Sequence, residues 1–440
     1  MPKPRTTVVM RALATTISAA LLLSACGAGS RTSSSTAAQV ECDFPAPSKA
    51  TSVNVLAYNS SAIDPFTNTM VKSCSKNQVT VKHEPIDFGG QVQKTTATLA
   101  GDTGTYDVIE TYGFIIPKYA GEQKLRPLDE FVAEFDQEYG LSDINKAMRQ
   151  AMSYDGKLYG LPMQAQMYVM AYRKDVFESL GLKPPTTFAE LREVAGKIQQ
   201  AGQIKYPVAL PLLASSDIAT AYDSALGSLG VDYVDAATMT PNFDKPEAAE
   251  AFEELRSLAP FMDPQVTTFD QPRVQQQMYN GSAAVAIMFS GRMNDLTQTS
   301  NSRFAQQFAF APPPSVAGGD VLYNTLSVDG WSIPTNAAAD PKMLFEMIAS
   351  SVSADASKAS VPAAYPARDG IVTPGSSPYA EAAQVSIGKA PPAEPHPWTS
   401  RISNDTRTVV ADVVLGNTPV AEGTAQMQQI AVKILAEYEK

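Results

Sequence analysis

Between residues 53 and 112, short apolar segments alternate with helical segments, and this pattern constrains the fold most. Apolar, β-branched residues predict strands at 53–57, 79–84 and 106–110, and helices are predicted at 64–76 and 90–100. Strands that alternate with helices form a parallel sheet with helices on its faces. We therefore expect an α/β fold.

Polar and aromatic residues follow each of these predicted strands. Asn59 follows the first strand, Asp87 the second and Tyr112 the third. In open α/β sheets, ligands bind at the carboxyl ends of the strands. These three residues are candidate ligand contacts, although Asp87 could instead cap the helix that follows it.

Length and charge narrow the possible functions. The chain has 440 residues, 44% of them hydrophobic, which is enough for two lobes. Its net charge of −11 becomes −14 without residues 1–25, which hold three basic and no acidic residues. Nucleic acids and anionic lipids need a basic face, so neither is expected as a ligand.

The N-terminus has the pattern of an export signal. Three basic residues precede an apolar stretch, 12–25, that is too short to span a bilayer. It ends in Leu-Ser-Ala-Cys-Gly, a lipobox, so we predict a signal peptide at 1–25 and lipidation of Cys26. An uncleaved anchor is the alternative. Residues 26–50 are expected to form a flexible tether.

Two further cysteines, Cys42 and Cys74, are predicted to form a disulfide, because exported proteins meet an oxidising compartment. The bond would close a loop of about 33 residues and contribute roughly 3 to 4 kcal/mol in the chain-entropy model. Two buried free thiols are the alternative.

Catalytic and metal-binding motifs are missing from the sequence. The only histidines, His83 and His396, are far apart, and no HExxH, GxSxG or Walker motif occurs. We expect no metal, no cofactor and no catalytic residue. A pair of carboxylates for glycoside hydrolysis stays open, because its spacing is spatial.

Several segments resemble, in order, the family 1 extracellular solute-binding proteins of ABC transporters, which include maltose-binding protein. The most specific is DGKLYGLP at 155–162. The others are LRPLD at 125–129, YRKDVF at 172–177, PTTFAEL at 185–191, MYNGSAAV at 278–285 and GWSIP at 330–334. Asp329 stands where the family pattern has a glycine. The resemblance covers residues 53–438.

The resemblance implies a two-lobe periplasmic-binding-protein type II fold whose chain crosses the hinge three times. The crossings are expected near 164–169, 310–312 and 350–353. The implied N-terminal lobe is 51–165 with 312–350, and the implied C-terminal lobe is 166–311 with 351–440.

The implied function is capture of a sugar, amino sugar or polyol outside the cell by a monomer that is not an enzyme. A separate permease and ATPase would receive the ligand, and the lipid alone would hold the protein on the outer face of the cytoplasmic membrane. The alternatives are binding of a glycerophosphodiester, glycoside hydrolysis by a lipid-anchored enzyme, and adhesion.

Sugars need aromatic faces for their C–H sides and planar polar groups for their hydroxyls. Loop contexts and the resemblance add nine candidates to the three at strand ends: Gln164, Tyr168, Ser290, Arg292, Gly330, Trp331, Tyr365, Arg368 and Trp398. A core position is the alternative for Trp331 and Tyr168, and an ion pair is the alternative for Arg292 and Arg368.

Overall fold

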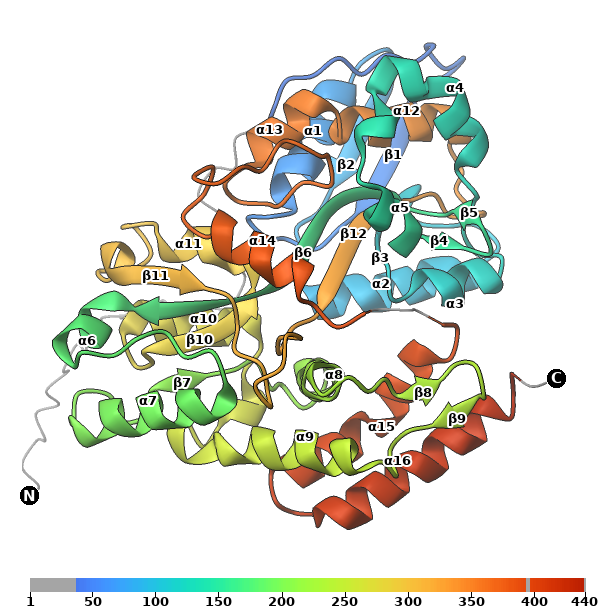
Figure 1. Cartoon of the computed structure of the whole chain (residues 1–440). Helices are drawn as coiled ribbons and strands as arrows, with labels where there is room; N and C mark the ends of the chain where they lie inside the picture. The colour runs from blue at the N-terminus through green and yellow to red at the C-terminus, as the bar shows by residue number, and fades with distance from the viewer. Residues whose placement is uncertain (1–36, 393–395, 439–440) are drawn as a thin grey trace, which may run out of the picture.

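The computed structural model describes residues 37–392 and 396–438 (Figure 1). The predicted signal peptide and Cys26 lie outside the described residues. Within these residues, no helix has the length and apolar character needed to cross a membrane.

The first lobe is built around a sheet in the order β2–β1–β3–β12–β6. Strands β1 (Thr51–Leu56), β2 (Val79–His83) and β3 (Val108–Tyr112) are parallel, and β12 (Leu326–Ser332) joins them antiparallel. The helices α1 (Asp64–Cys74) and α2 (Phe88–Ala100) connect the three parallel strands. The alternation predicted between residues 53 and 112 is confirmed.

Strand β6 (Leu161–Arg173) belongs to both lobes, as Figure 1 shows. Its first half, Leu161 to Met167, pairs with β12 in the first sheet. Its second half, from Tyr168, pairs with β10 (Val285–Phe289) and β11 (Phe308–Ala311), and β7 (Val208–Ala209) extends this second sheet. The first hinge crossing therefore falls within the predicted segment 164–169.

The other two crossings come later in the chain than predicted. Beyond β11, the chain keeps partners in the second lobe, because Ser315 accepts from Phe188 and Asn324 accepts from the Tyr168 amide. It enters the first sheet at Leu326 instead of near 310–312. The position of residues 312–325 depends on contacts with distant parts of the chain, which the local sequence pattern does not reveal.

The last crossing follows Arg368 instead of 350–353. Helix α13 (Ala354–Ser360) packs on α1, and Pro366 bridges to Gln164 in the first half of β6. Helix α14 (Ala380–Gly388) then contacts β6 and β11. Residues 351–368 thus pack with the first lobe.

The remaining helices and strands cover the two sheets or form short hairpins. They are α3 (Ile116–Gly121), α4 (Asp129–Tyr139), α5 (Lys146–Ala151), β4 (Ser153–Tyr154), β5 (Lys157–Leu158), α6 (Lys174–Ser179), α7 (Phe188–Gln200), α8 (Asp217–Ser228), β8 (Val234–Asp235), β9 (Thr240–Pro241), α9 (Pro246–Ser257), α10 (Gln271–Asn280), α11 (Met293–Leu296), α12 (Pro341–Ser351), α15 (Thr399–Val414) and α16 (Val420–Leu435).

Local signals in the sequence account for several of these boundaries. Helix α7 begins where Thr187 accepts from the Glu190 amide, and the Glu190 carboxylate accepts from the Thr186 amide in return. The β4–β5 turn has positive φ at Asp155 and Gly156, a backbone conformation that Asp-Gly favours in tight hairpins.

Part of the predicted tether is ordered along α1. The Ala38 amide donates to Thr69 and the Val40 amide to Ser73, and Cys42 and Phe44 are buried. Cys42 and Cys74 form a disulfide with a Cα–Cα distance of 5.4 Å, as predicted. The bond joins this N-terminal segment to the last residue of α1.

Replacing both cysteines by serine should lower the free energy of unfolding by roughly 3 to 4 kcal/mol, because the unfolded chain regains the freedom of the open loop. Urea unfolding with and without a reductant measures the loss. The double variant should not respond to the reductant, whereas an equal response in both proteins would contradict a role for this bond.

Candidate functional site

A buried polar network lies where the two lobes meet on β6. The Asp329 carboxylate accepts hydrogen bonds from Gln164 Nε2 at 3.0 Å, Gln166 Nε2 at 2.7 Å and Ser327 Oγ at 3.1 Å. Gln166 Nε2 also contacts the Tyr58 hydroxyl at 3.1 Å. These hydrogen bonds connect the loop after β1 to β6 and β12, the two strands that pair at the hinge.

Asp329 is shielded from solvent, and its burial raises its pKa to about 6 despite the three donors. Glu110 on β3 is also wholly buried, and one of its oxygens accepts from the Tyr58 amide at 3.0 Å. Burial and the charge of Asp329 raise the pKa of Glu110 well above its ordinary value. Glu110 therefore holds its proton to a higher pH than an exposed glutamate does.

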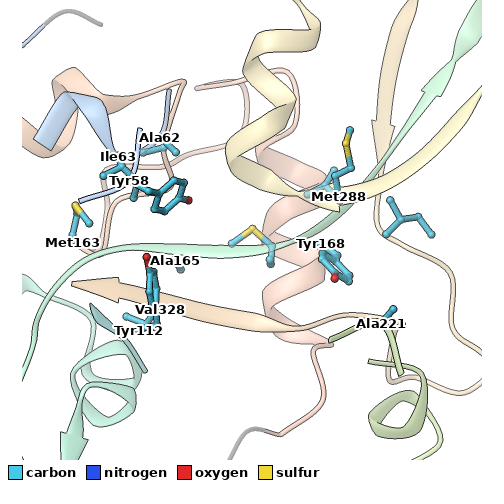
Figure 2. Close-up of a cluster of buried hydrophobic side chains, with 14 of the residues drawn as sticks. Tyr58, Ala62, Ile63, Tyr112, Met163, Ala165, Tyr168, Ala221, Met288 and Val328 are labelled. Carbon is cyan, nitrogen blue, oxygen red and sulfur yellow. The ribbon is translucent and has the colours of Figure 1, made fainter. Parts of the chain in front are cut away.

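Four aromatic rings extend from this network across the strand ends of the first lobe. Tyr58 packs edge-on against Phe88 at 5.6 Å, Phe88 lies 5.5 Å from Tyr112, and Tyr112 stacks on Phe114 at 5.5 Å. Figure 2 shows Tyr58 and Tyr112 beside the first half of β6, and Tyr168 farther along it. We call Tyr58, Phe88, Tyr112 and Phe114 the aromatic row.

The two lobes touch beside this network. Ser61, in the loop after β1, donates towards the Gly291 carbonyl at 3.2 Å and towards the Asp295 carboxylate at 3.1 Å. Gly291 belongs to a 3-10 helix after β10. A Cβ at Gly291 would lie 2.8 Å from Gln166 Oε1 and 2.9 Å from Ala62 Cβ. The close approach of the lobes therefore requires glycine.

Arg292 brings a positive charge to the same junction. Its side chain is half-buried, and its Nη1 is buried without a hydrogen-bond partner among the described residues. Its charge lowers the pKa of Tyr58 and of Asp295, although burial raises both overall. The guanidinium is thus near the phenol and has donor capacity left for a ligand.

Three of the predicted site residues, Tyr112, Gln164 and Arg292, lie in or beside this junction. Asn59 is close by in the chain, where its amide donates to Asp64 and its buried oxygen has no partner in the described structure. Ser290 is buried next to Gly291. Whether any of them contacts a ligand stays a prediction.

Two other candidates, Asp87 and Arg368, have structural roles: Asp87 the helix cap that the sequence left as its alternative, and Arg368 backbone hydrogen bonds where an ion pair was the alternative. Asp87 caps α2 by accepting from the Gly90 amide at 2.7 Å. The Arg368 guanidinium donates to the carbonyls of Val352, Gly140 and Tyr139, so its donors are used inside the protein. The prediction that Arg368 binds the ligand is not supported, because a structural role already uses its guanidinium.

The predicted stacking role of Trp331 is also not supported. Trp331 is 0% exposed on β12, where it pairs with Glu110 and Leu161 of the neighbouring strands. Gly330 has no space for a side chain, since a Cβ would lie 2.6 Å from the Leu161 carbonyl oxygen. The sequence GWSIP at 330–334, which suggested contact with a ligand, instead reflects the close packing of β12 between β3 and β6.

The last three aromatic candidates lie in different places. Tyr168 is buried between Phe289 and Tyr323 in the second lobe. Tyr365 is half-buried and lines a cavity of about 170 Å³ beside the hinge, together with residues of α5, β12 and α14. Trp398 is half-buried and stacks on His396 at 4.5 Å. The structure does not bring these three residues together.

Several residues at the junction escaped the sequence reasoning. Tyr58, Phe88, Phe114, Gln166 and Asp329 were not predicted. One of them could have been found from strand periodicity, because residues two apart share a face of a strand, and Gln166 is two residues beyond Gln164 on β6. No group of three or more potential metal ligands occurs in the described parts of the chain.

The pKa of Asp329 gives a test of this network. Because its folded pKa is raised from 3.8 to about 6, the folded chain keeps a proton that the unfolded chain releases. Its contribution to stability should therefore be largest below pH 4 and be lost as pH rises through 6. The loss should be on the order of 1 to 3 kcal/mol.

Urea unfolding of the wild type and Asp329→Asn between pH 4 and pH 7 isolates this effect, because other carboxyls titrate in both proteins. As pH rises from 4 to 7, the free energy of unfolding of the wild type should fall relative to that of Asp329→Asn. A difference that does not change with pH would contradict the raised pKa.

Gly291→Ala should force the lobes apart at their contact and lower the free energy of unfolding by about 1 to 3 kcal/mol. Gly388→Ala is the control, because no heavy atom lies within 4 Å of a Cβ at this helical position. Small-angle scattering and thermal unfolding would measure both effects. Equal behaviour of the two variants would argue against a tight contact at Gly291.

Comparison with known proteins places the chain among binding proteins. A family model described as bacterial extracellular solute-binding protein matches residues 66–358. A maltotriose-binding protein of Pyrococcus abyssi is 33% identical over 175 residues, which are 39% of this chain and 35% of that protein. A mannitol-binding protein of Pseudomonas aeruginosa is 28% identical over 120 residues, 27% of each chain. The chain thus matches about a third or less of the length of these two relatives.

Solved structures share the fold over almost their whole length. A solute-binding protein of an Agrobacterium vitis ABC transporter with bound D-mannitol has a TM-score of 0.76 at 22% identity, covering 88% of this chain and 99% of its own. Maltose-bound T. maritima MalE3 has a TM-score of 0.78 at 17% identity, covering 87% and 99%. The predicted two-lobe fold is confirmed.

Proposed function

The chain belongs to the bacterial extracellular solute-binding protein family, and from this premise we propose that it captures a sugar, amino sugar or polyol between its two lobes. A separate permease and ATPase of an ABC importer would then receive the ligand. Relatives and structural neighbours named for maltotriose, mannitol, maltose and ribitol support a polyhydroxylated ligand.

The observation that carries this proposal is the combination of groups at the lobe junction. Phe88 and Phe114 offer exposed ring faces that rest on the buried Tyr58 and Tyr112, while Arg292 offers a planar donor whose Nη1 has no partner among the described residues. Polyhydroxylated molecules need both kinds of group, since ring C–H bonds pack on aromatic faces and hydroxyls need directed hydrogen bonds. Both lobes contribute, so the ligand would bridge them.

Binding without hydrolysis fits the two carboxyls of the junction. Glu110 and Asp329 are both wholly buried, and Asp329 is committed to three protein donors. A glycosidase needs two carboxyl groups that flank the scissile bond with access to it. We therefore favour a binding protein over an enzyme, and a single cation at Arg292 favours a neutral ligand over a phosphodiester.

The proposal includes the predicted location of the protein. Lipidation of Cys26 would hold the chain on the outer face of the cytoplasmic membrane as a monomer, near the permease at high effective concentration. Membrane fractionation of the wild type and Cys26→Ser would show whether the lipid is the anchor.

A thermal-shift screen of sugars, amino sugars, polyols and glycerophosphodiesters should find stabilisation by a sugar or polyol, followed by calorimetry of the best ligand. Arg292→Ala should weaken the binding of that ligand by roughly tenfold or more, because a hydrogen-bond donor to a ligand hydroxyl is lost. Arg303→Ala, at an exposed arginine of the same lobe, is the matched control. Stabilisation by phosphodiesters alone, or cleavage of an added glycoside, would contradict the proposal.

A further inference from the structure

Residues 37–44 form an extended segment that runs along α1, and we call this segment the N-terminal strap. Its inner side faces the protein, because Val40 is half-buried and Cys42 and Phe44 are buried. The exposed residues between them are Gln39, Glu41 and Asp43. This alternation is typical of an extended chain that packs one side on a core.

The strap is attached to α1 near both of its ends. The Lys72 ammonium donates to the Ala37 carbonyl at 3.3 Å, and Lys76, just after the helix, forms an ion pair with Asp43 at 2.8 Å. The two amide hydrogen bonds and the disulfide described above lie between these contacts. The strap is therefore part of the folded first lobe.

The strap runs in the same direction as α1. Its successive contacts lie farther along the helix, from Thr69 to Cys74. Helix α1 begins shortly after Ser61, which contacts the second lobe, and runs back along the sheet because it connects two parallel strands. Followed from β1 towards the N-terminus, the strap thus leads the chain back towards the lobe junction.

The strap also shortens the chain between the predicted lipid and the folded protein. Eleven residues, 26–36, separate Cys26 from the strap, and they span at most about 40 Å when extended. Without the strap, residues 26–50 would span up to about 90 Å. A folded body of about 400 residues is roughly 55 Å across, because its radius of gyration is about 21 Å. Only the longer tether would let every side of the protein reach the bilayer.

We propose that the strap sets the orientation of the protein on the membrane. The α1 side of the first lobe is held next to the bilayer, and the second lobe is kept away from it. Figure 1 shows the strap as the dark blue coil at one end of the molecule and α16 at the other end. This inference rests on the lipid anchor of the proposed function and adds which side of the chain faces the membrane.

The test places the same flexible Gly/Ser spacer of about twelve residues at two positions of the lipidated protein on liposomes. One spacer follows Ser35, before the strap, and the other follows Pro47, after the strap. Fluorophores are attached in separate proteins at Lys358→Cys on α13, which packs on α1, and at Val432→Cys, an exposed position of α16. Energy transfer to an acceptor lipid measures how close each site is to the bilayer.

In the wild type, energy transfer should be at least about twofold greater from α13 than from α16, because the short tether holds α13 nearer the bilayer. The spacer before the strap should remove most of this difference, since it lengthens the tether. The spacer after the strap should leave the difference unchanged, because the contacts with α1 hold the strap on the lobe whatever the length of chain that follows it.

Circular dichroism and thermal unfolding check that each variant folds, and the liposome-bound fraction checks the anchor. Equal energy transfer from the two sites of the wild type would overturn the inference, and so would equal effects of the two spacers. If the wild type does not stay on the liposomes, the lipid anchor of the proposed function fails, and the orientation fails with it. Sugar binding in the thermal-shift screen is independent of this result.

Discussion

The backbone of β6 is the constraint on which both lobes depend. One strand supplies hydrogen-bonding edges to two sheets, so its pairing with β12 and with β10 and β11 fixes the orientation of each lobe at the hinge. A strand cannot slip by one residue without exchanging its faces. The alternation of Gln164, Gln166 and Tyr168 along one face is therefore what sets polar groups beside the junction.

The junction also concentrates groups that are costly to bury. Asp329 is stabilised by three donors, whereas Glu110 accepts from the Tyr58 amide and its other oxygen has no partner within the described chain. Burial of two nearby acids is tolerable when at least one stays neutral, since two like charges in a poorly solvated site repel strongly. Burying these groups lowers the stability of the fold at the contact between the lobes. Such a loss of stability is common at functional sites.

The sequence predicted the local features well and the long-range ones poorly. Neighbouring residues were enough to predict the order of strands and helices from 53 to 112 and the Asp155-Gly156 hairpin. The oxidising compartment expected for an exported protein was enough to predict the Cys42–Cys74 disulfide. The later hinge crossings were misplaced, because segments 312–325 and 361–368 are held by partners more than a hundred residues away. Trp331 was misjudged since only the pairing of β12 between β3 and β6 reveals that it is enclosed. The exposed phenylalanines could not be foreseen, because exposure of an apolar side chain is a property of the packed structure.

The separation of the two tryptophans has a spectroscopic consequence. Trp331 is enclosed in the sheet of the first lobe, and Trp398 lies half-buried before α15 in the second. The chain has no other tryptophan. Emission from Trp331 is set by a dry apolar surrounding, while emission from Trp398 is set by its contact with the His396 ring and by solvent. Each lobe thus carries its own intrinsic fluorophore, and single Trp→Phe variants would allow the unfolding of either lobe to be followed alone.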